Sequence, residues 1–191
     1  INTKLYLGYC KRIGSIIYPA FEFAVPYDKI PYDPQKARQL LKDAGYANGF
    51  DAGDFTPYPP YTDLAQAIAL YLQDVGIRVN IKTMERPAFL DAYRNKQLKG
   101  MILTVTGAYG NAATIMESYV ISSAPYAQVG YPEIDKLFEQ QAVEVNYEKR
   151  KAILAQIQQI LHDQVIFVPV INIAVPYGIG PRVKGRVIGV I

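Results

Sequence analysis

The sequence predicts an α/β fold, in which a mixed sheet is flanked by helices. Two observations lead to this prediction. Between residues 33 and 106, segments with helical periodicity alternate with short runs of strand character, which is typical of α/β layers with at least partly parallel strands. Of the 191 residues, 50% are hydrophobic and 19% are charged, a composition typical of a globular protein with its own core.

The first helices are predicted mainly from their termini. Residues 2–12 have the character of a helix end, and residues 14–31 form a loop rich in Pro and aromatic residues. Asp33 is expected to be the N-cap of the next helix, with Pro34 at its first position. Gly45 is expected to end that helix as a left-handed cap.

Two more helices and three strands follow. The first of these helices begins near Thr62. Thr62 is expected to cap the helix, and Gly76 is expected to end it. Pro87 opens a further short helix that carries apolar residues on one face. Strands are expected at residues 50–58, 77–81 and 101–106, and in the second of these apolar and polar residues alternate.

The second half begins with a long connection. Residues 107–130 are expected to be irregular, and connections of this length are usually functional or disordered. Helices are then predicted to begin at Tyr131-Pro132 and after the N-cap Asn146. A buried strand is expected at residues 165–171, and residues 173–191 are expected to form an extended tail.

The sequence contains few residues that could form a catalytic or metal-binding site. The single Cys, Cys10, excludes a disulfide within the chain, and with one His, His162, a site built from His and Cys is not expected. Both residues are interpreted as structural, Cys10 as a small buried side chain and His162 as a helix-end residue. The acids Glu133, Asp135 and Glu139 are expected to lie on a solvated helix face. No cofactor is expected.

The charge pattern argues against nucleic-acid binding. The net charge is +3, and the basic residues are interspersed with acidic ones. Tyrosine is the unusual residue type, with 16 Tyr and no Trp, and several of these residues fall in irregular segments. Tyrosine offers an apolar face and a polar tip, so such residues either pack in half-buried loops or line a cleft for a small organic ligand.

Several segments resemble one known family in a single register. They are Pro31-Tyr32-Asp33-Pro34, Ala44-Gly45-Tyr46, Val75-Gly76-Ile77, Tyr131-Pro132-Glu133-Ile134, Gln156-Ile157-Gln158-Gln159-Ile160-Leu161 and Val168-Pro169-Val170. These segments are similar to the C-terminal lobe of family 5 extracellular solute-binding proteins, the class that binds dipeptides, oligopeptides and nickel. The resemblance covers nearly the whole chain.

The resemblance implies a two-lobed periplasmic or extracellular receptor, whose lobes close around a solute and deliver it to the membrane permease of an ABC importer. Residues 1–172 would be the C-terminal ligand-binding lobe, of the periplasmic binding protein type II-like fold. Residues 173–191 would return toward a missing N-terminal lobe. Both chain ends look cut, so the sequence is interpreted as a fragment of a larger protein.

One stretch departs from the family pattern. Peptide-binding members carry Gly-Trp after the strand, followed by an Asp that is thought to hold the peptide amine, and then Asp-Pro. Here Gly107 matches, Ala108 stands at the Trp position, Asn111 at the Asp position, and the Asp-Pro is absent. A neutral amide is a weaker partner for an ammonium group than a carboxylate. The solute is therefore expected to lack a free amine and to be neutral or anionic, although a peptide stays possible.

Solute contacts are expected just beyond the strand that ends at Thr106, because ligands of open α/β sheets bind beyond the strand ends. The candidates are Thr106, Gly107, Tyr109 and Asn111, joined by Tyr18 and Tyr27 from the early loop. Two alternatives stay open: a ligand-sensing domain of a cytoplasmic transcriptional regulator, and an enzyme completed by residues outside this chain.

Overall fold

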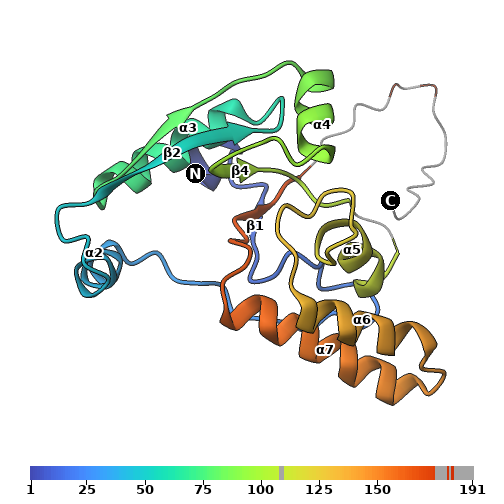
Figure 1. Cartoon of the computed structure of the whole chain (residues 1–191). Coiled ribbons are helices and arrows are strands. Elements are labelled where there is room, and N and C mark those ends of the chain that lie inside the picture. Colours follow the sequence, from blue (N-terminus) through green and yellow to red (C-terminus); the bar gives the residue numbers. More distant parts are fainter. Residues whose placement is uncertain (108–109, 175–179, 181, 183–191) are drawn as a thin grey trace. The chain divides into compact units, whose positions relative to one another are not determined.

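The structure is a computed structural model, and it describes residues 1–107, 110–174, 180 and 182 (Figure 1). The chain forms two compact units. Unit 1 consists mainly of residues Ile30–Val105, and unit 2 mainly of residues Tyr6–Lys29 together with the described residues from Thr106 on. Each unit carries its own secondary structure and its own buried core.

In unit 1, helices alternate with parallel strands. Its helices are α2 (Pro34–Asp43), α3 (Thr62–Asp74) and α4 (Arg86–Arg94), and its strands are β2 (Phe50–Pro57), β3 (Ile77–Ile81) and β4 (Met101–Leu103). The strand order is β3-β2-β4, and β2 pairs in parallel with both neighbours. The predicted α/β fold with parallel strands is therefore confirmed.

Local chemistry explains most of the element boundaries in unit 1. The Asp33 carboxylate accepts a hydrogen bond from the Lys36 amide at 2.9 Å and so caps α2 as predicted. Gly45 and Gly76 both have positive φ, +88° and +95°, where the helices end. The cap predicted at Thr62 is wrong, because Tyr61 occupies the N-cap position and makes no side-chain capping bond.

The core of unit 1 lies between the sheet and its helices. Buried side chains come from β2 (Phe55, Thr56), from α3 (Leu64, Ala65) and from α4 (Phe89, Tyr93). In β2 the inward residues gather at the carboxyl end of the strand, where Phe55, Thr56 and Pro57 are all buried. The best-packed part of the unit thus supports the edge of the sheet at which a solute is expected.

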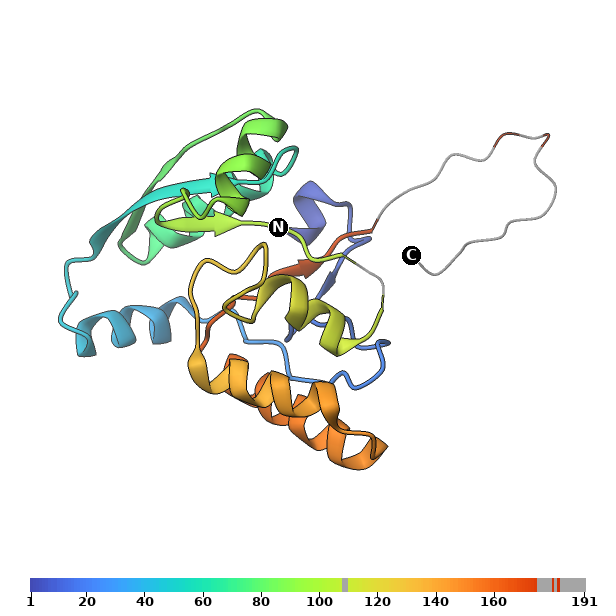
Figure 2. The same ribbon diagram turned by 45° about the vertical axis from the view of Figure 1, so that its right-hand side comes forward.

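Unit 2 is mainly helical. It contains α5 (Ala112–Tyr119), α6 (Pro132–Val143) and α7 (Tyr147–Asp163), and α6 and α7 lie side by side in Figures 1 and 2. A small antiparallel sheet joins β1 (Lys11–Arg12) to β5 (Ile171–Asn172). The predicted cap of α7 is confirmed, since the Asn146 side chain accepts from the Lys149 amide at 3.1 Å.

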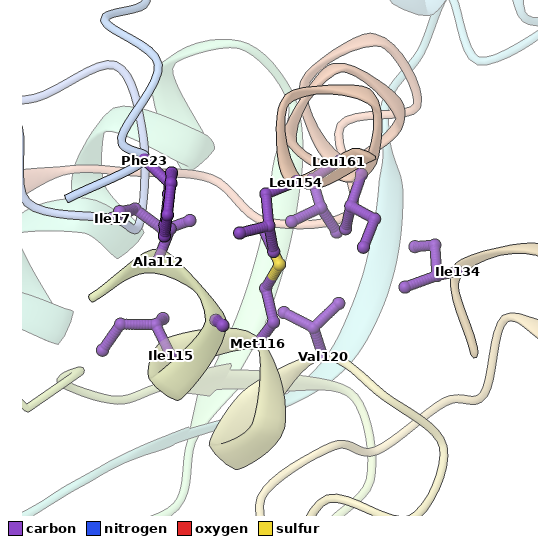
Figure 3. Close-up of a cluster of buried hydrophobic side chains, with 11 residues drawn as sticks. Ile17, Phe23, Ala112, Ile115, Met116, Val120, Ile134, Leu154 and Leu161 are labelled. Atoms are coloured by element: carbon purple, nitrogen blue, oxygen red, sulfur yellow. The ribbon is translucent and has the colours of Figure 1, made fainter. Parts of the chain in front are cut away.

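Eleven buried residues form the core of unit 2, and Figure 3 shows this cluster. Ile115 and Met116 of α5, Leu154 and Ile157 of α7, and Ile134 of α6 are each no more than 2% exposed. Ile17 and Phe23, from the Pro-rich segment before α2, join this cluster. That segment has no regular structure of its own, and burial of these two side chains fixes it against the helices.

The structure corrects two expectations about irregular and strand segments. Residues 107–130 are not irregular throughout, because α5 occupies Ala112–Tyr119 and buries four of its side chains. The strand expected at residues 165–171 is wrong: Val165 has a φ of +50°, Val168 is 71% exposed, and β5 begins only at Ile171. An apolar run predicts burial, but a strand also needs a partner to pair with.

Two further differences concern length. The strand expected at residues 101–106 pairs only over Met101–Leu103, where β2 runs alongside it. Residues 2–12 contain one helical turn, α1 (Asn2–Leu5), and then β1, rather than a helix end. Most of the predicted tail, at 175–179, 181 and 183–191, lies outside the described residues, so the division into a lobe at 1–172 and a tail stays a prediction.

Candidate functional site

The candidate site is the connection that leaves β4 and enters α5. Thr106 and Gly107 are half-buried, Gly110 is exposed, and Asn111 is half-buried at the start of the helix. Tyr109, a predicted contact, lies outside the described residues together with Ala108. The described residues of this connection from Thr106 on belong to unit 2.

Asn111 caps α5 through a reciprocal pair of bonds with Thr114. The Thr114 amide donates to Asn111 Oδ1 at 3.3 Å, and the Asn111 amide donates to Thr114 Oγ1 at 3.4 Å. Such a capping box satisfies backbone donors that the first helical turn leaves unpaired. The Thr114 hydroxyl can also donate to Asn111 Oδ1, at 3.4 Å. The oxygen of the Asn111 side chain is therefore held against the helix.

This cap determines which end of the amide is free. Because Oδ1 accepts from Thr114, the Nδ2 group of Asn111 is directed away from the capping bonds, and it has no partner within the described ranges. An Asn NH2 group carries two donors and no acceptor. The arrangement is suited to a carbonyl or carboxylate oxygen, and it offers nothing to an ammonium group.

Gly110 allows the chain to turn into this cap. Its φ is +86°, and a Cβ built there would lie 2.5 Å from Thr114 Oγ1. A side chain at this position would therefore be strained and would push against the hydroxyl that completes the capping box. The sequence Gly110-Asn111 followed by Thr114 carries the signal for this helix start, whereas Asn111 was predicted only as a solute contact.

The Pro-rich segment lies against the same connection. Thr106 Oγ1 donates to the carbonyl of Ile16 at 3.2 Å, and the Ala112 amide donates to the carbonyl of Glu22 at 3.0 Å. Tyr18 lies in this segment, 45% exposed, with its ring edge-on to Phe21 at 5.8 Å between centroids. The structure thus brings Thr106, Asn111 and the segment that carries Tyr18 together.

Tyr27 contacts the end of α7 instead. Its ring stacks on His162 with centroids 4.3 Å apart, and its hydroxyl donates to Gln159 Oε1 at 3.3 Å. Burial, and then the negative charge of Asp163, raise the pKa of Tyr27. Hydrogen bonds from Gln159 and then His162 lower the pKa of the Asp163 carboxyl. These contacts assign Tyr27 a packing role, and no contact here tests its predicted part in the site.

The residues considered for other chemistry have structural partners. Cys10 is buried and accepts a hydrogen bond from the Ala174 amide at 3.4 Å. Asp135 is not simply solvated as expected, because it accepts hydrogen bonds from both the amide and the hydroxyl of Ser122. No group of His, Cys, Asp and Glu able to hold a metal occurs among the residues that the structure describes.

No helix in the described part of the chain is long and apolar enough to cross a bilayer.

The candidate site consists of a capped helix start, a hydroxyl, a glycine-containing connection and nearby tyrosine rings. Such a surface can form hydrogen bonds with a small organic molecule and pack against it, which is the character of ligand sites in general.

The chain is similar to a curated protein of Haemophilus influenzae, Heme-binding protein A. The two are 30% identical over 168 residues, which cover 82% of this chain and 30% of that protein. A shorter match, 34% identical over 84 residues, is to Glutathione-binding protein GsiB of Escherichia coli, and it covers 42% of this chain and 16% of the relative. The chain thus spans less than a third of the length of either relative.

Solved structures share the fold. The periplasmic binding protein DppA of Helicobacter pylori, in complex with the peptide STSA, has a TM-score of 0.75 at 23% identity, over 89% of this chain and 35% of that one. With the dipeptide binding protein of Pseudoalteromonas sp. SM9913 in complex with Met-Leu, the score is 0.75 over 90% of this chain. The predicted periplasmic binding protein type II-like fold is confirmed.

The profile of the bacterial extracellular solute-binding proteins, family 5 (middle part), matches residues 1–127. That match covers more than half of the chain, and it includes β2, β3, β4 and α5. The extracellular character of the family agrees with the location predicted from the resemblance, periplasmic or extracellular. The chain belongs to the bacterial extracellular solute-binding proteins of family 5.

Proposed function

We propose that this chain is part of the solute-binding component of an ABC importer, and that it captures a small organic solute without transforming it. Its membership of family 5 and the names of its relatives, which are binding proteins, support this role. The partners would be the solute, the membrane permease of the importer and an N-terminal lobe that completes the cleft. Because one lobe offers half a cleft, we expect weak binding by this lobe alone.

We further propose that the solute is neutral or anionic and lacks a free amine. The observation that carries this step is the capping bond of Asn111, which holds the side-chain oxygen against α5 and leaves the NH2 group as the part of the amide available to a ligand. A carboxylate at the same position would keep an oxygen free for an ammonium group. The proposed contacts are Thr106, Gly107, Tyr109, Asn111, Tyr18 and Tyr27.

The alternative of a ligand-sensing domain in a cytoplasmic regulator gains no support from the comparisons. The family and the solved neighbours are extracellular or periplasmic binding proteins. No observation on the described residues favours a regulator over a receptor.

A thermal-shift screen of the full-length gene product tests this function. The panel contains peptides, nickel complexes, sugars, and aromatic and fatty acids. We expect at least one non-peptide organic solute to raise the melting temperature, because a ligand that binds only the folded state stabilises it. If no class of solute shifts the melting temperature, the receptor role is wrong.

The variant Asn111→Asp then tests the solute class. Asp caps helices as well as Asn does, so the variant should keep its fold and change only the charge at this position. We expect it to bind the solute identified in the screen no better than the wild type. Tighter binding of that solute by Asn111→Asp, or a strong shift of the wild type by peptides alone, would contradict the proposed solute class.

A further inference from the structure

A second group of side chains gathers at the carboxyl edge of the unit 1 sheet. Tyr58 follows β2 directly, and its amide donates to the carbonyl of Leu103 at 2.8 Å, so β2 and β4 end side by side. Arg86 begins α4, which follows β3. Because the three strands are parallel, the segments that follow them leave the sheet at one edge, where open α/β sheets bind ligands.

The Tyr58 ring is held from one side by buried aromatic residues. It meets Phe89 at 5.3 Å between centroids in an edge-on contact, and Phe89 in turn meets Tyr93 at 5.5 Å. Phe89 is fully buried, whereas Tyr58 and Tyr61 are half-buried, with their centroids 6.1 Å apart. The two tyrosines therefore form an aromatic surface supported by the core of the unit.

Arg86 extends over this surface. The centre of its guanidinium lies 5.6 Å from the Tyr58 ring centroid, within the range of a cation–π contact. The side chain is exposed, and within the described ranges it makes no hydrogen bond or ion pair, not even with the neighbouring Glu85. Its planar fork of donors is thus oriented by the tyrosine and available to an oxyanion.

We propose that Tyr58, Tyr61 and Arg86 form a contact site for a planar organic acid. The ring of the acid packs against the two tyrosines, and its carboxylate accepts hydrogen bonds from the Arg86 guanidinium. This inference rests on the proposed function and narrows the solute from neutral or anionic to anionic and aromatic. It also assigns a role to Tyr58 and Tyr61, neither of which was among the solute contacts predicted from the sequence.

A purely structural role for Arg86 makes a different prediction. If the guanidinium only covers Tyr58, its removal changes the stability of the protein and leaves solute discrimination unchanged. The test therefore needs a measure of discrimination between charged and neutral forms of the same molecule, in addition to a melting temperature.

Calorimetric titration of the full-length gene product provides that measure. The probes are matched acids and amides: 4-hydroxybenzoate with 4-hydroxybenzamide, phenylacetate with phenylacetamide, and hexanoate with hexanamide. We expect the aromatic acids to bind about tenfold more tightly than their amides, which corresponds to about 1.4 kcal/mol. We expect hexanoate, which lacks a ring, to bind more weakly than either aromatic acid.

Two variants and one control locate the effect. Arg86→Gln should weaken the aromatic acids about tenfold, to the level of their amides, because it removes the charge from an exposed position. Tyr58→Leu should weaken the aromatic acids but not hexanoate. The control Arg78→Gln makes the same charge change at an exposed position of β3 and should leave every affinity unchanged.

The outcomes separate this inference from the proposed function. If a solute in the general screen binds, but the aromatic acids are not preferred to their amides or Arg86→Gln behaves like Arg78→Gln, the contact site is wrong and the receptor role stands. If no solute of any class binds, both are wrong. A loss of affinity for acids and amides alike in Arg86→Gln would also contradict the proposal.

Discussion

At the scale of single residues, Gln158 is a buried polar side chain of unit 2 that makes three hydrogen bonds. It is 2% exposed, and its Oε1 accepts from the Val25 amide at 2.8 Å. Its Nε2 donates to the carbonyls of Phe23 at 2.8 Å and Leu154 at 3.0 Å. One buried amide thus attaches the Pro-rich segment, which adjoins the candidate site, to α7.

Replacing the Gln158 side-chain amide should lower the stability of the fold. In Gln158→Leu the side chain keeps a similar volume, but the amide of Val25 and the carbonyl of Phe23 lose their partners. Each unsatisfied buried group costs about 1–3 kcal/mol, so we expect the free energy of unfolding to fall by about 2–4 kcal/mol in urea denaturation. The control Gln156→Leu, exposed on the same helix, should change it by less than about 0.5 kcal/mol. Equal losses in both variants would contradict the role of Gln158.

At the scale of secondary-structure elements, the start of α5 carries a prediction of its own. Asn111→Ala removes the side chain that accepts from the Thr114 amide, and loss of an N-cap typically costs about 1 kcal/mol. Asn111→Asp should retain nearly all of the stability, since Asp accepts the same bond. Urea denaturation of the three proteins checks this order. A variant Asn111→Ala as stable as the wild type would show that the cap contributes nothing.

Helix termini were predictable because their determinants are local. Asp33 and Asn146 cap the starts of α2 and α7, and Gly45 follows the end of α2. Each acts on residues no more than four positions away, so the sequence alone contains the whole interaction. The cap predicted at Thr62 was wrong, because the presence of a residue type that often caps helices does not guarantee that its side chain forms the capping bond. The helix α5 was missed because its small residues suggested a loop, although Asn111 and Thr114 marked its start.

Strands were less predictable, since a strand exists only where a partner lies beside it. The apolar run at 165–171 has strand composition, yet only Ile171 and Asn172 pair, with Lys11 and Arg12 from the other end of the chain. Nothing near residue 165 in the sequence reveals that distant partner. The proposed solute contacts show the same limit of sequence-based prediction. Asn111 was predicted from its position in a family motif, whereas the contact of Arg86 with Tyr58 joins residues far apart in the sequence and is visible only in the folded structure.

At the scale of the whole molecule, the sequence predicted one lobe, and the structure shows that the described residues form two compact units. The solute contacts proposed around Asn111 belong to unit 2, and the proposed acid site around Arg86 belongs to unit 1. Each site is supported by the core of its own unit. Buried Phe89 contacts the Tyr58 ring in unit 1, and the buried residues of α5, the helix that Asn111 caps, belong to the core of unit 2.

Separate cores predict separate local stabilities. Leu154→Ala, in the core of unit 2, should cost about 2–5 kcal/mol, and Phe89→Ala, in the core of unit 1, about 3–5 kcal/mol. Amide hydrogen exchange followed by mass spectrometry should show faster exchange in α5, α6 and α7 for Leu154→Ala, and in β2, α3 and α4 for Phe89→Ala. Each variant is the control for the other. If either substitution accelerates exchange equally in both sets of elements, the two units unfold as one, and a solute bound in one unit would then stabilise both.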